Sequence, residues 1–309
     1  MNQSHQPVLL DEVLNALHVD PAGSYVDATL GAGGHAAAVV ARLTTGRLIG
    51  LDRDPQALKL AHKMLTGANV ELHLSNFARL AEVLERAGVD KIDGALFDLG
   101  TSSMQLDQPQ RGFSFRADGP LDMRMGPDAH LSAAQWLAQV SERELEAALR
   151  RFGEERFSGR IARAIVRYRN EQGNLSTTGE LAHLVEVSIP HPARRKARIH
   201  PATRTFQAIR IAINDELAAI PAGLEAAFEH LKVGGTLVVI AFHSLEDRPV
   251  KQFFQRKSQG CTCPPGLPQC VCNKQAEVKR FPLVKPSDTE IERNPRARSA
   301  RLRAGRKLA

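Results

Sequence analysis

The sequence predicts an α/β protein, a doubly wound and mostly parallel sheet whose chain is interrupted by an all-helical insertion. In the first third of the chain, short apolar strands alternate with amphipathic helices, which is the order of a βαβ protein. Between Ser132 and about Pro190 the apolar spacing is helical throughout, and an apolar strand returns at 233–242. The pattern divides the chain into one discontinuous domain, 1–107 and 201–309, and an inserted helical domain for substrate recognition, 108–200.

Composition limits the class of protein. The chain has 309 residues, enough for one large or two ordinary domains, and 43% of them are hydrophobic, enough for a core. The 41 basic and 34 acidic side chains leave a net charge of +7, which weakly favours a polyanionic partner. The sequence shows no apolar leader and no long uncharged apolar run, so we expect a cytoplasmic protein without a membrane partner.

A glycine-rich turn is the centre of the predicted site. Residues 25–35 have the pattern of a strand, a turn and the start of a helix. Glycines give the turn backbone angles closed to other residues and let a ligand touch the main chain. The next strand, 47–51, ends in Asp52, whose carboxylate is placed to accept hydrogen bonds from both ribose hydroxyls of a nucleoside. An ordinary tight turn is the alternative, but the strand, the helix and Asp52 together favour a nucleoside cofactor.

The acidic residue before the turn narrows the choice of cofactor. Asp27 precedes the glycines and would repel a diphosphate. It suits a cationic or zwitterionic group, such as the amino acid end of S-adenosylmethionine.

Three more candidate side chains follow strands of the sheet. Phe77 comes just after the third strand, 70–74, Asp98 ends the fourth, and His243 follows the apolar fifth. Ligands of such sheets bind outside the carboxyl ends of the strands. Phe77 is therefore placed to lie beside an adenine, although a core phenylalanine is the alternative.

The loop after Asp98 has neither a strand nor a helix period, and Arg111 and Phe113 stand in it. Long irregular loops beside a ligand site are often functional, and arginine beside phenylalanine suits splayed-out RNA bases. A loop packed on its own phenylalanines is the alternative. The arginine-rich insertion favours phosphate contacts, as does the basic stretch 191–201, which we expect to be a hinge.

All four cysteines lie in one short segment, as Cys261-Thr262-Cys263 and Cys270-Val271-Cys272. Four thiolates grouped in this way suit a structural zinc site, but their spacing is tighter than that of the common C-x-x-C ribbon. A loop without metal, favoured by Pro264-Pro265-Gly266, is the competing interpretation. We assign no metal to the functional site.

Motifs spread along the chain, from about His5 to Arg303, resemble the RsmH (MraW) family of methyltransferases. They are Gly33-Gly34-His35, Asp52-Arg53-Asp54, Asp98-Leu99-Gly100-Thr101-Ser102-Ser103, Arg111-Gly112-Phe113-Ser114-Phe115, Gly119-Pro120-Leu121-Asp122-Met123-Arg124, Gly153-Glu154-Glu155-Arg156, His200-Pro201-Ala202-Thr203-Arg204-Thr205-Phe206-Gln207 and Phe242-His243-Ser244-Leu245-Glu246-Asp247-Arg248. Together these motifs are far more specific than the glycine turn alone.

The resemblance implies a class I S-adenosylmethionine-dependent methyltransferase fold, which is a Rossmann-like doubly wound sheet, with an inserted all-helical domain. It implies that S-adenosylmethionine is the cofactor of N4-methylation of a cytidine in the decoding region of 16S ribosomal RNA, in the small ribosomal subunit. The cofactor contacts that it implies fall on Gly33, Gly34, His35, Asp52, Phe77, Asp98 and Gln105. A homodimer is a further hypothesis.

Two side chains are candidates for the chemistry. Alignment of the exocyclic amine with the methyl group is the main task. Asp98 is placed to accept a hydrogen bond from that amine, as is the loop with Ser102 and Ser103, and His243 is the candidate to take up the released proton.

Recognition of the RNA has its own candidates. Many amino-methylating enzymes carry an Asp/Asn-Pro-Pro-aromatic run after the fourth strand, but here the run is Asp98-Leu99-Gly100-Thr101, so stacking of the base falls to Phe113, Phe115 or Phe242. The RNA-binding candidates are Arg111, Phe113, Arg194, Arg195, Arg198 and Arg204.

Other classes of protein share some of these features. A nicotinamide dehydrogenase would share the βαβ start but would prefer a glycine turn without Asp27. A non-catalytic RNA-binding factor would explain the charge but would not need Asp27, Asp52 and Asp98 together. The closer rival, a methyltransferase of proteins or small molecules, would not need the arginines of the insertion.

Overall fold

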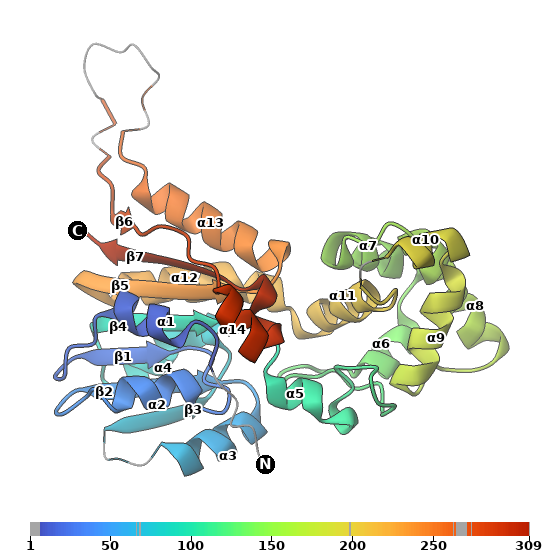
Figure 1. The fold of residues 1–309 in the computed structure, drawn as a ribbon, viewed down its shortest axis with the longest axis horizontal. Helices are drawn as coiled ribbons and strands as arrows, with labels where there is room; N and C mark the ends of the chain where they lie inside the picture. The colour runs from blue at the N-terminus through green and yellow to red at the C-terminus, as the bar shows by residue number, and fades with distance from the viewer. Residues whose placement is uncertain are drawn as a thin grey trace. The chain divides into compact units, whose positions relative to one another are not determined.

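The computed structural model describes residues 7–65, 67, 69–197, 199–261, 263, 271–272 and 274–308. Its contacts divide the chain into two compact units (Figure 1). The sheet unit consists of Met1–Gly100 and Leu217–Ala309, and the helical unit is Thr101–Glu216.

The sheet unit is built on seven strands in the order β3-β2-β1-β4-β5-β7-β6. The first five strands of that order are parallel, and β7 is antiparallel to both of its neighbours. The strands are β1 (Ser24–Asp27), β2 (Arg47–Asp52), β3 (Val70–Leu74), β4 (Ile92–Asp98), β5 (Leu231–Ala241), β6 (Val278–Arg280) and β7 (Arg301–Lys307). A doubly wound sheet was predicted, and this order confirms it.

Helices cover both faces of this sheet, which is why its central strands are apolar on both sides. One core joins the strands to α4 (Leu80–Arg86), α12 (Glu216–His230) and α13 (Ser244–Ser258). The other core joins them to α1 (Leu10–Leu17), α2 (Gly34–Val40) and α3 (Pro55–Met64). Successive residues of β1 alternate between the two, since Tyr25 belongs to the second core and Val26 to the first.

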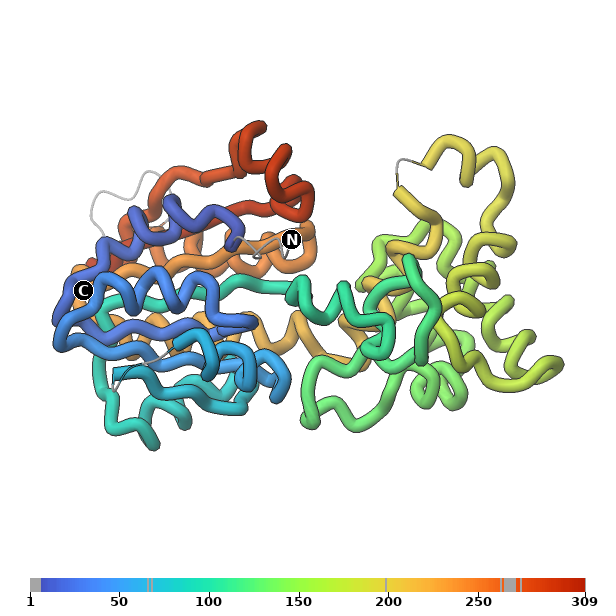
Figure 2. Tube along the Cα trace, turned by 60° about the horizontal axis from the view of Figure 1, so that its bottom comes forward, coloured from blue at the N-terminus to red at the C-terminus, as the bar shows by residue number. Residues whose placement is uncertain are grey.

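The C-terminal segment packs back on the N-terminal one. Oε1 of Glu290, in α14 (Asp288–Arg293), accepts a hydrogen bond of 2.7 Å from the N–H of Leu9. Figures 1 and 2 show the two segments side by side. A short η3 (Pro295–Ser299) then leads into β7. The sequence predicts this last strand near 297–303, but it begins at Arg301 because η3 comes first.

The helical unit contains a separate hydrophobic core. Its elements are α5 (Ser103–Asp107), η2 (Pro109–Arg111), α6 (Ala133–Gln139), α7 (Glu142–Gly153), α8 (Ser158–Glu171), α9 (Thr178–Ser188), α10 (His191–Lys196) and α11 (Thr203–Asn214). The spacing of Ser141 and Glu144 predicts a capping box, and the structure confirms it at the start of α7.

The contacts place the boundaries of the helical unit at 100/101 and 216/217, whereas the sequence analysis placed them at 107/108 and 200/201. The second difference arises because α11 packs closely on α7. A Cβ added to Gly153 of α7 would lie 2.6 Å from the carbonyl oxygen of Arg204, so only glycine fits there. The predicted hinge at 191–201 also contains a helix, α10.

The sequence predicts a long helical region over 202–231 with a break near Pro221, but the break lies elsewhere. It lies at Asp215, whose left-handed backbone (φ 51°) ends α11, and Pro221 is inside α12. No helix in the described part of the chain is both long and apolar enough to span a membrane.

One buried side chain holds the irregular segment of the helical unit to α11. Asn214 is 1% exposed, and its amide donates to the carbonyl of Met123 at 2.8 Å and accepts from the N–H of Met125 at 2.8 Å. Met123 has a left-handed backbone, with φ 58°, which is strained for a residue with a long side chain. Asn214 therefore stabilises a conformation that the segment would not keep alone.

We expect Asn214→Ala to destabilise the helical unit by about 2–4 kcal/mol, because it leaves buried backbone groups without partners. Urea unfolding followed by fluorescence measures this unit alone, because the single tryptophan, Trp136, lies in its helix α6. Asn170→Ala, on the exposed end of α8, is the matched control. Equal unfolding midpoints for the two variants would show that Asn214 does not have this role.

Candidate cofactor and catalytic site

The carboxyl ends of β1, β2, β4 and β5 bring acidic side chains together at one edge of the sheet. Asp27, Asp52 and Asp98 end the first three of these strands, and Phe242 and His243 follow the fourth. The hydroxyl of Thr29, just after β1, accepts a hydrogen bond of 2.5 Å from the N–H of Asp98. Burial is the main cause of the raised pKa of Asp27, and the Asp98 and Asp52 carboxylates raise it further, so the three acids form one electrostatic group.

The glycine turn has the geometry that requires glycine. Gly31 (φ 53°) and Gly33 (φ 90°) both have left-handed backbones. A Cβ on Gly34, the first residue of α2, would lie 2.6 Å from Cγ of Pro7. The turn is thus closely packed against Pro7, and a side chain at Gly34 would displace it.

Asp52 is tied to this turn. Its Oδ2 accepts from the N–H of Gly31 at 2.7 Å, and its Oδ1 accepts from the N–H of Asp54 at 2.8 Å. Burial raises its pKa to about 6. Each carboxylate oxygen accepts more than one hydrogen bond, so Asp52 retains acceptor capacity for a diol while it fixes the turn.

Asp27 and His35 are buried beneath the turn, at 3% and 6% exposure. Burial raises the pKa of Asp27 to about 7 and lowers that of His35. Nε2 of His35 lies 2.9 Å from the carbonyl oxygen of Val8. Since that oxygen only accepts, Nε2 carries the proton, and the lone pair of Nδ1 is directed to the side of Asp98, whose Oδ2 is 3.8 Å away.

Asp98 is the acid with unused bonding capacity. Its Oδ1 is buried and has no hydrogen-bond partner among the residues that the structure describes, although 26% of the side chain is exposed. Burial and then the Glu246 carboxylate raise its pKa to about 7. A buried acceptor without a partner is unfavourable, so this atom is suited to a donor on a ligand.

Sequence reasoning missed Glu246. It is 2% exposed, and its Oε2 accepts from the N–H groups of Phe242 at 2.8 Å and His243 at 3.3 Å. Nδ1 of His243 in turn accepts from the N–H of Glu246 at 3.3 Å, which completes a capping box at the start of α13. The spacing of a cap residue and a glutamate three positions on was the available signal, but histidine is an unusual cap.

This capping box restricts the predicted role of His243. Nδ1 accepts the capping hydrogen bond, so neutral His243 carries its proton on Nε2. That atom lies 2.9 Å from Oε1 of Glu246, but it is not aligned for a hydrogen bond. His243 can take up a proton only if Nδ1 gives up the cap, whereas Asp98 needs no such rearrangement.

Two residues predicted to contact the cofactor, Phe77 and Gln105, also make packing or capping contacts within the protein. Phe77, in η1 (Phe77–Arg79), is half-buried and packs edge-on against Phe97 with ring centroids 5.6 Å apart. Gln105 belongs to the helical unit, where it is buried and accepts from the N–H of Ser102 at 3.2 Å in a capping box.

The sequence pattern of the loop predicts exposed aromatic side chains that could stack on RNA bases, and this prediction of exposure is wrong. Phe113 is 7% exposed and lies in the core of the helical unit, and Phe115 packs on Phe206 and His200 with ring centroids 4.9 and 4.5 Å away. The loop is thus packed on its own phenylalanines. The buried residues of the loop do not recur at a helix or strand period. The sequence pattern therefore could not distinguish an RNA-binding loop from one packed on its own phenylalanines.

The predicted RNA-binding arginines differ in whether the structure shows a protein partner for the guanidinium group. The guanidinium of Arg111 donates to the carbonyl of Arg124, and that of Arg204 to the carbonyl of Glu154, both at 2.9 Å. Arg194 pairs with Glu186 at 3.4 Å. Arg195 is exposed, and Arg198 lies outside the described residues.

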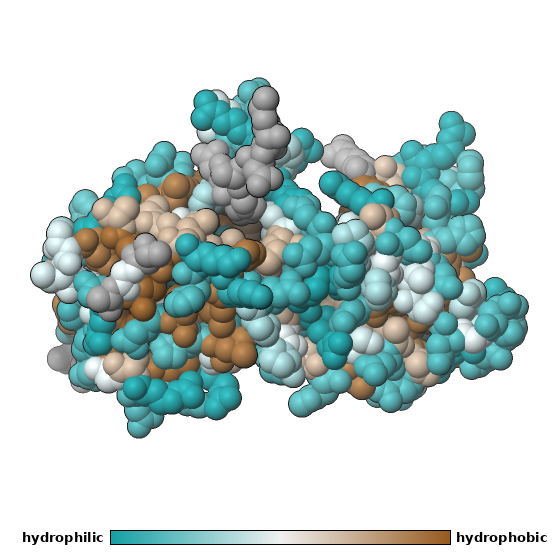
Figure 3. Space-filling model, turned by 90° about the horizontal axis from the view of Figure 1, so that it is seen from below, coloured by the Kyte–Doolittle hydropathy of each residue, from teal (hydrophilic) through white to brown (hydrophobic). Residues whose placement is uncertain are grey.

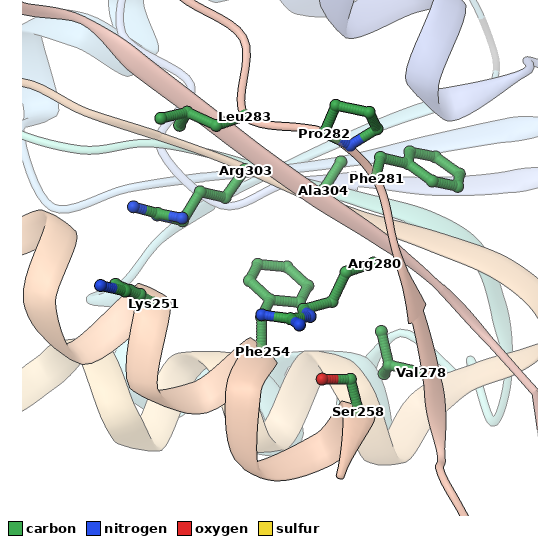
Figure 4. A pocket seen from close by; sticks show the side chains of 10 residues that line it. All are labelled: Lys251, Phe254, Ser258, Val278, Arg280, Phe281, Pro282, Leu283, Arg303 and Ala304. Atoms are coloured by element: carbon green, nitrogen blue, oxygen red, sulfur yellow. The ribbon is translucent and has the colours of Figure 1, made fainter.

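A basic cavity of about 540 Å³ lies between α13, β6 and β7 of the sheet unit (Figure 4). Lys251, Arg280 and Arg303 contribute its charges, and Phe254 contributes to its apolar wall. Arg303 also forms a 2.7 Å ion pair with Asp247, which is 5% exposed. None of the three carboxylates of the sheet edge lines this cavity, so it is separate from the candidate site.

The strand order, the antiparallel strand β7, the glycine turn and the carboxylates at one edge define a class I S-adenosylmethionine-dependent methyltransferase. The model of the MraW methylase family matches residues 2–308, and the chain belongs to that family. The predicted enzyme class, fold and cofactor are therefore confirmed.

Relatives of similar length share about half of the sequence. The chain is 51% identical over 309 residues to "Ribosomal RNA small subunit methyltransferase H" of Symbiobacterium thermophilum, covering 98% of this chain and 96% of the relative. It is 50% identical over 315 residues to the protein of the same name from Heliobacterium mobile, covering 100% of both.

Solved structures also resemble the chain. A putative rRNA-methylase from Clostridium thermocellum is 12% identical with a TM-score of 0.46, covering 99% of this chain and 100% of that one. A putative methyltransferase from Streptococcus mutans in complex with SAH is 12% identical with a TM-score of 0.45, covering 98% and 100%.

We expect cofactor affinity to rise with pH. Without ligand, the raised pKa values of about 7, 6 and 7 at Asp27, Asp52 and Asp98 mean that the folded protein binds protons more tightly than the unfolded chain. This contribution to stability is present at low pH and is lost as the pH rises towards 7. A cationic ligand prefers the ionised acids, so its binding releases protons below about pH 7.

Calorimetry should show S-adenosylmethionine binding at least about tenfold tighter at about pH 7.5 than at about pH 5.5. Adenosine, which has neither sulfonium nor ammonium, is the matched ligand, and its affinity should change much less. An affinity for S-adenosylmethionine that stays flat or falls across this range would contradict the electrostatic account.

Proposed function

We propose that this protein methylates N4 of a cytidine in the decoding region of 16S ribosomal RNA, acting on the small ribosomal subunit in the cytoplasm. Membership of the methylase family and the printed names of relatives at 50–51% identity support the RNA substrate. The observation that carries the chemistry is the buried Oδ1 of Asp98, which has no partner among the described residues.

The site fits the cofactor in charge and in shape. When bound, S-adenosylmethionine supplies an electrophilic methyl group on a sulfonium. Asp52 holds the ribose hydroxyls while it fixes the turn through Gly31. The ionised forms of Asp27 and Asp98 suit the positive groups of the ligand, and the positive-φ glycine turn lets the ligand approach the main chain.

Asp98 aligns the target amine. Its Oδ1 accepts a hydrogen bond from an N–H of the exocyclic amine, which directs the nitrogen lone pair at the methyl carbon. As the N–C bond forms and the C–S bond breaks, the amine becomes more acidic, and its proton passes to Asp98. A carboxyl with a pKa of about 7 is matched to that transfer near neutral pH.

The helical unit, Thr101–Glu216, recognises the RNA. The base must be unpaired and turned outward to reach the site, and exposed cations such as Arg195 hold the adjoining phosphates. Hydrophilic residues cover most of the face seen in Figure 3, and the net charge of +7 favours a polyanion.

The proposed reaction is tested by tritiated methyl transfer to small ribosomal subunits from cells that lack this protein. We expect label in the RNA, and nucleoside analysis should place it in N4-methylcytidine. Subunits from cells that contain the protein are the matched control and should take up little label, since their target is already methylated. Label in protein, or in another nucleoside, would refute the proposal.

The role of Asp98 is tested by the single-turnover rate at saturating cofactor. We expect Asp98→Asn to lower this rate by about 10²-fold or more, because the amide cannot take up the proton. Asp93→Asn is the matched control. Asp93 lies near the amino end of the same strand and pairs with Lys232 at 2.8 Å, so its rate should stay close to the original. An unchanged single-turnover rate for Asp98→Asn would show that Asp98 does not take up the proton.

A further inference from the structure

A cluster of thiols lies in the segment between α13 and β6. The sulfur atoms of Cys261, Cys263 and Cys272 all lie within 4.8 Å of one another. Cys261 and Cys263 belong to the first C-x-C stretch of the segment, and Cys272 belongs to the second. The structure thus brings together cysteines that the sequence alone only grouped, and none of them belongs to the methyltransferase site.

The spacing of these sulfur atoms matches a shared metal ion. Sγ of Cys272 lies 3.7 Å from Sγ of Cys261. A zinc–sulfur distance of about 2.3 Å with tetrahedral angles separates two ligand sulfurs by about 3.8 Å. A disulfide would bring them to about 2.05 Å. The observed separation therefore agrees with joint coordination and is far too long for a covalent bond.

Backbone N–H groups donate hydrogen bonds to two of the cysteine sulfur atoms, which favours their thiolate form. The N–H of Cys263 donates to Sγ of Cys261, and the N–H of Val271 donates to Sγ of Cys263, both at 3.4 Å. Such bonds stabilise a thiolate more than a neutral thiol and orient it, as partners of metal ligands do. One backbone N–H from each C-x-C stretch thus donates a hydrogen bond to a sulfur atom of the cluster.

The base of the segment is closed, which brings the two stretches together. The N–H of Glu277 donates to the carbonyl of Lys257 at 2.8 Å, and the side chains of these two residues form an ion pair of 3.2 Å. Lys257 belongs to α13, and Glu277 directly precedes β6. A metal ion bound by the cysteines would therefore add a second cross-link between two stretches that Lys257 and Glu277 already hold together.

We propose that Cys261, Cys263 and Cys272 bind a Zn²⁺ ion that staples the segment between α13 and β6. Soft thiolate ligands select zinc over magnesium or calcium. The site is structural and supplies no step of methyl transfer, because no acid of the carboxyl edge belongs to the cluster. Its effect is to hold the two sides of the segment in register.

The test measures metal in the purified full-length protein by mass spectrometry after extensive dialysis against metal-free buffer. We expect about one zinc per chain. The double variant Cys261→Ser/Cys272→Ser should carry less than about a tenth of that amount, because two of the three ligands are lost. Val271→Ser is the matched control. It changes an exposed side chain in the same stretch, keeps the amide that bonds Cys263, and should retain the metal.

Binding of S-adenosylmethionine by each variant checks that it is folded, since the cofactor site is separate. A double variant that fails to bind it is replaced by alkylation of the unaltered protein. In that experiment the three cysteines should react several-fold faster after a chelator is added, without any reductant. Cobalt substitution should give the visible absorption of a tetrahedral thiolate site.

Four results would each overturn the proposal. The first is protein free of zinc after purification with zinc in every buffer, and the second is equal zinc in the double variant and in the original. The third is a need for reductant before alkylation, which would identify a disulfide. Iron or copper in place of zinc would likewise reject the metal assigned.

Discussion

The site depends on holding three acidic side chains, Asp27, Asp52 and Asp98, at one poorly solvated edge of a sheet. Parallel strands cause this, because their carboxyl ends meet at the same edge. Burial opposes the charged form of each acid and raises its pKa. The protein thus carries an electrostatic penalty that a positively charged nucleoside relieves, so the same burial that weakens the empty fold strengthens ligand binding.

Elements with a local cause were predictable from the sequence. The bounds of β3, the end of β4 at Asp98 and the capping box of Ser141 agree with the prediction, because apolar alternation and cap spacing involve only near neighbours. Asp52 and Asp98 could be placed at strand ends for the same reason. The break at Asp215 could not, since a left-handed cap by aspartate leaves a weaker signal than the proline six residues later.

The features that the sequence did not reveal depend on distant contacts. Burial of Phe113 requires the whole core of the helical unit, and the assignment of α11 to that unit requires the close approach of Gly153 to Arg204. The carbonyl that fixes the tautomer of His35 belongs to Val8, far from it in the chain. Such partners have no fixed spacing, so a pattern search does not find them, whereas the cofactor turn follows from one continuous stretch.

The capping box of α13 links two parts of the site that would otherwise be independent. Glu246 holds the backbone after β5 and the ring of His243, and its charge also raises the pKa of Asp98 at the end of β4. Substitutions at these three positions should therefore show epistasis, because the effect of a change at one depends on which residue occupies the others. A designer who wished to change the pKa of Asp98 through Glu246 would therefore also have to redesign the start of α13.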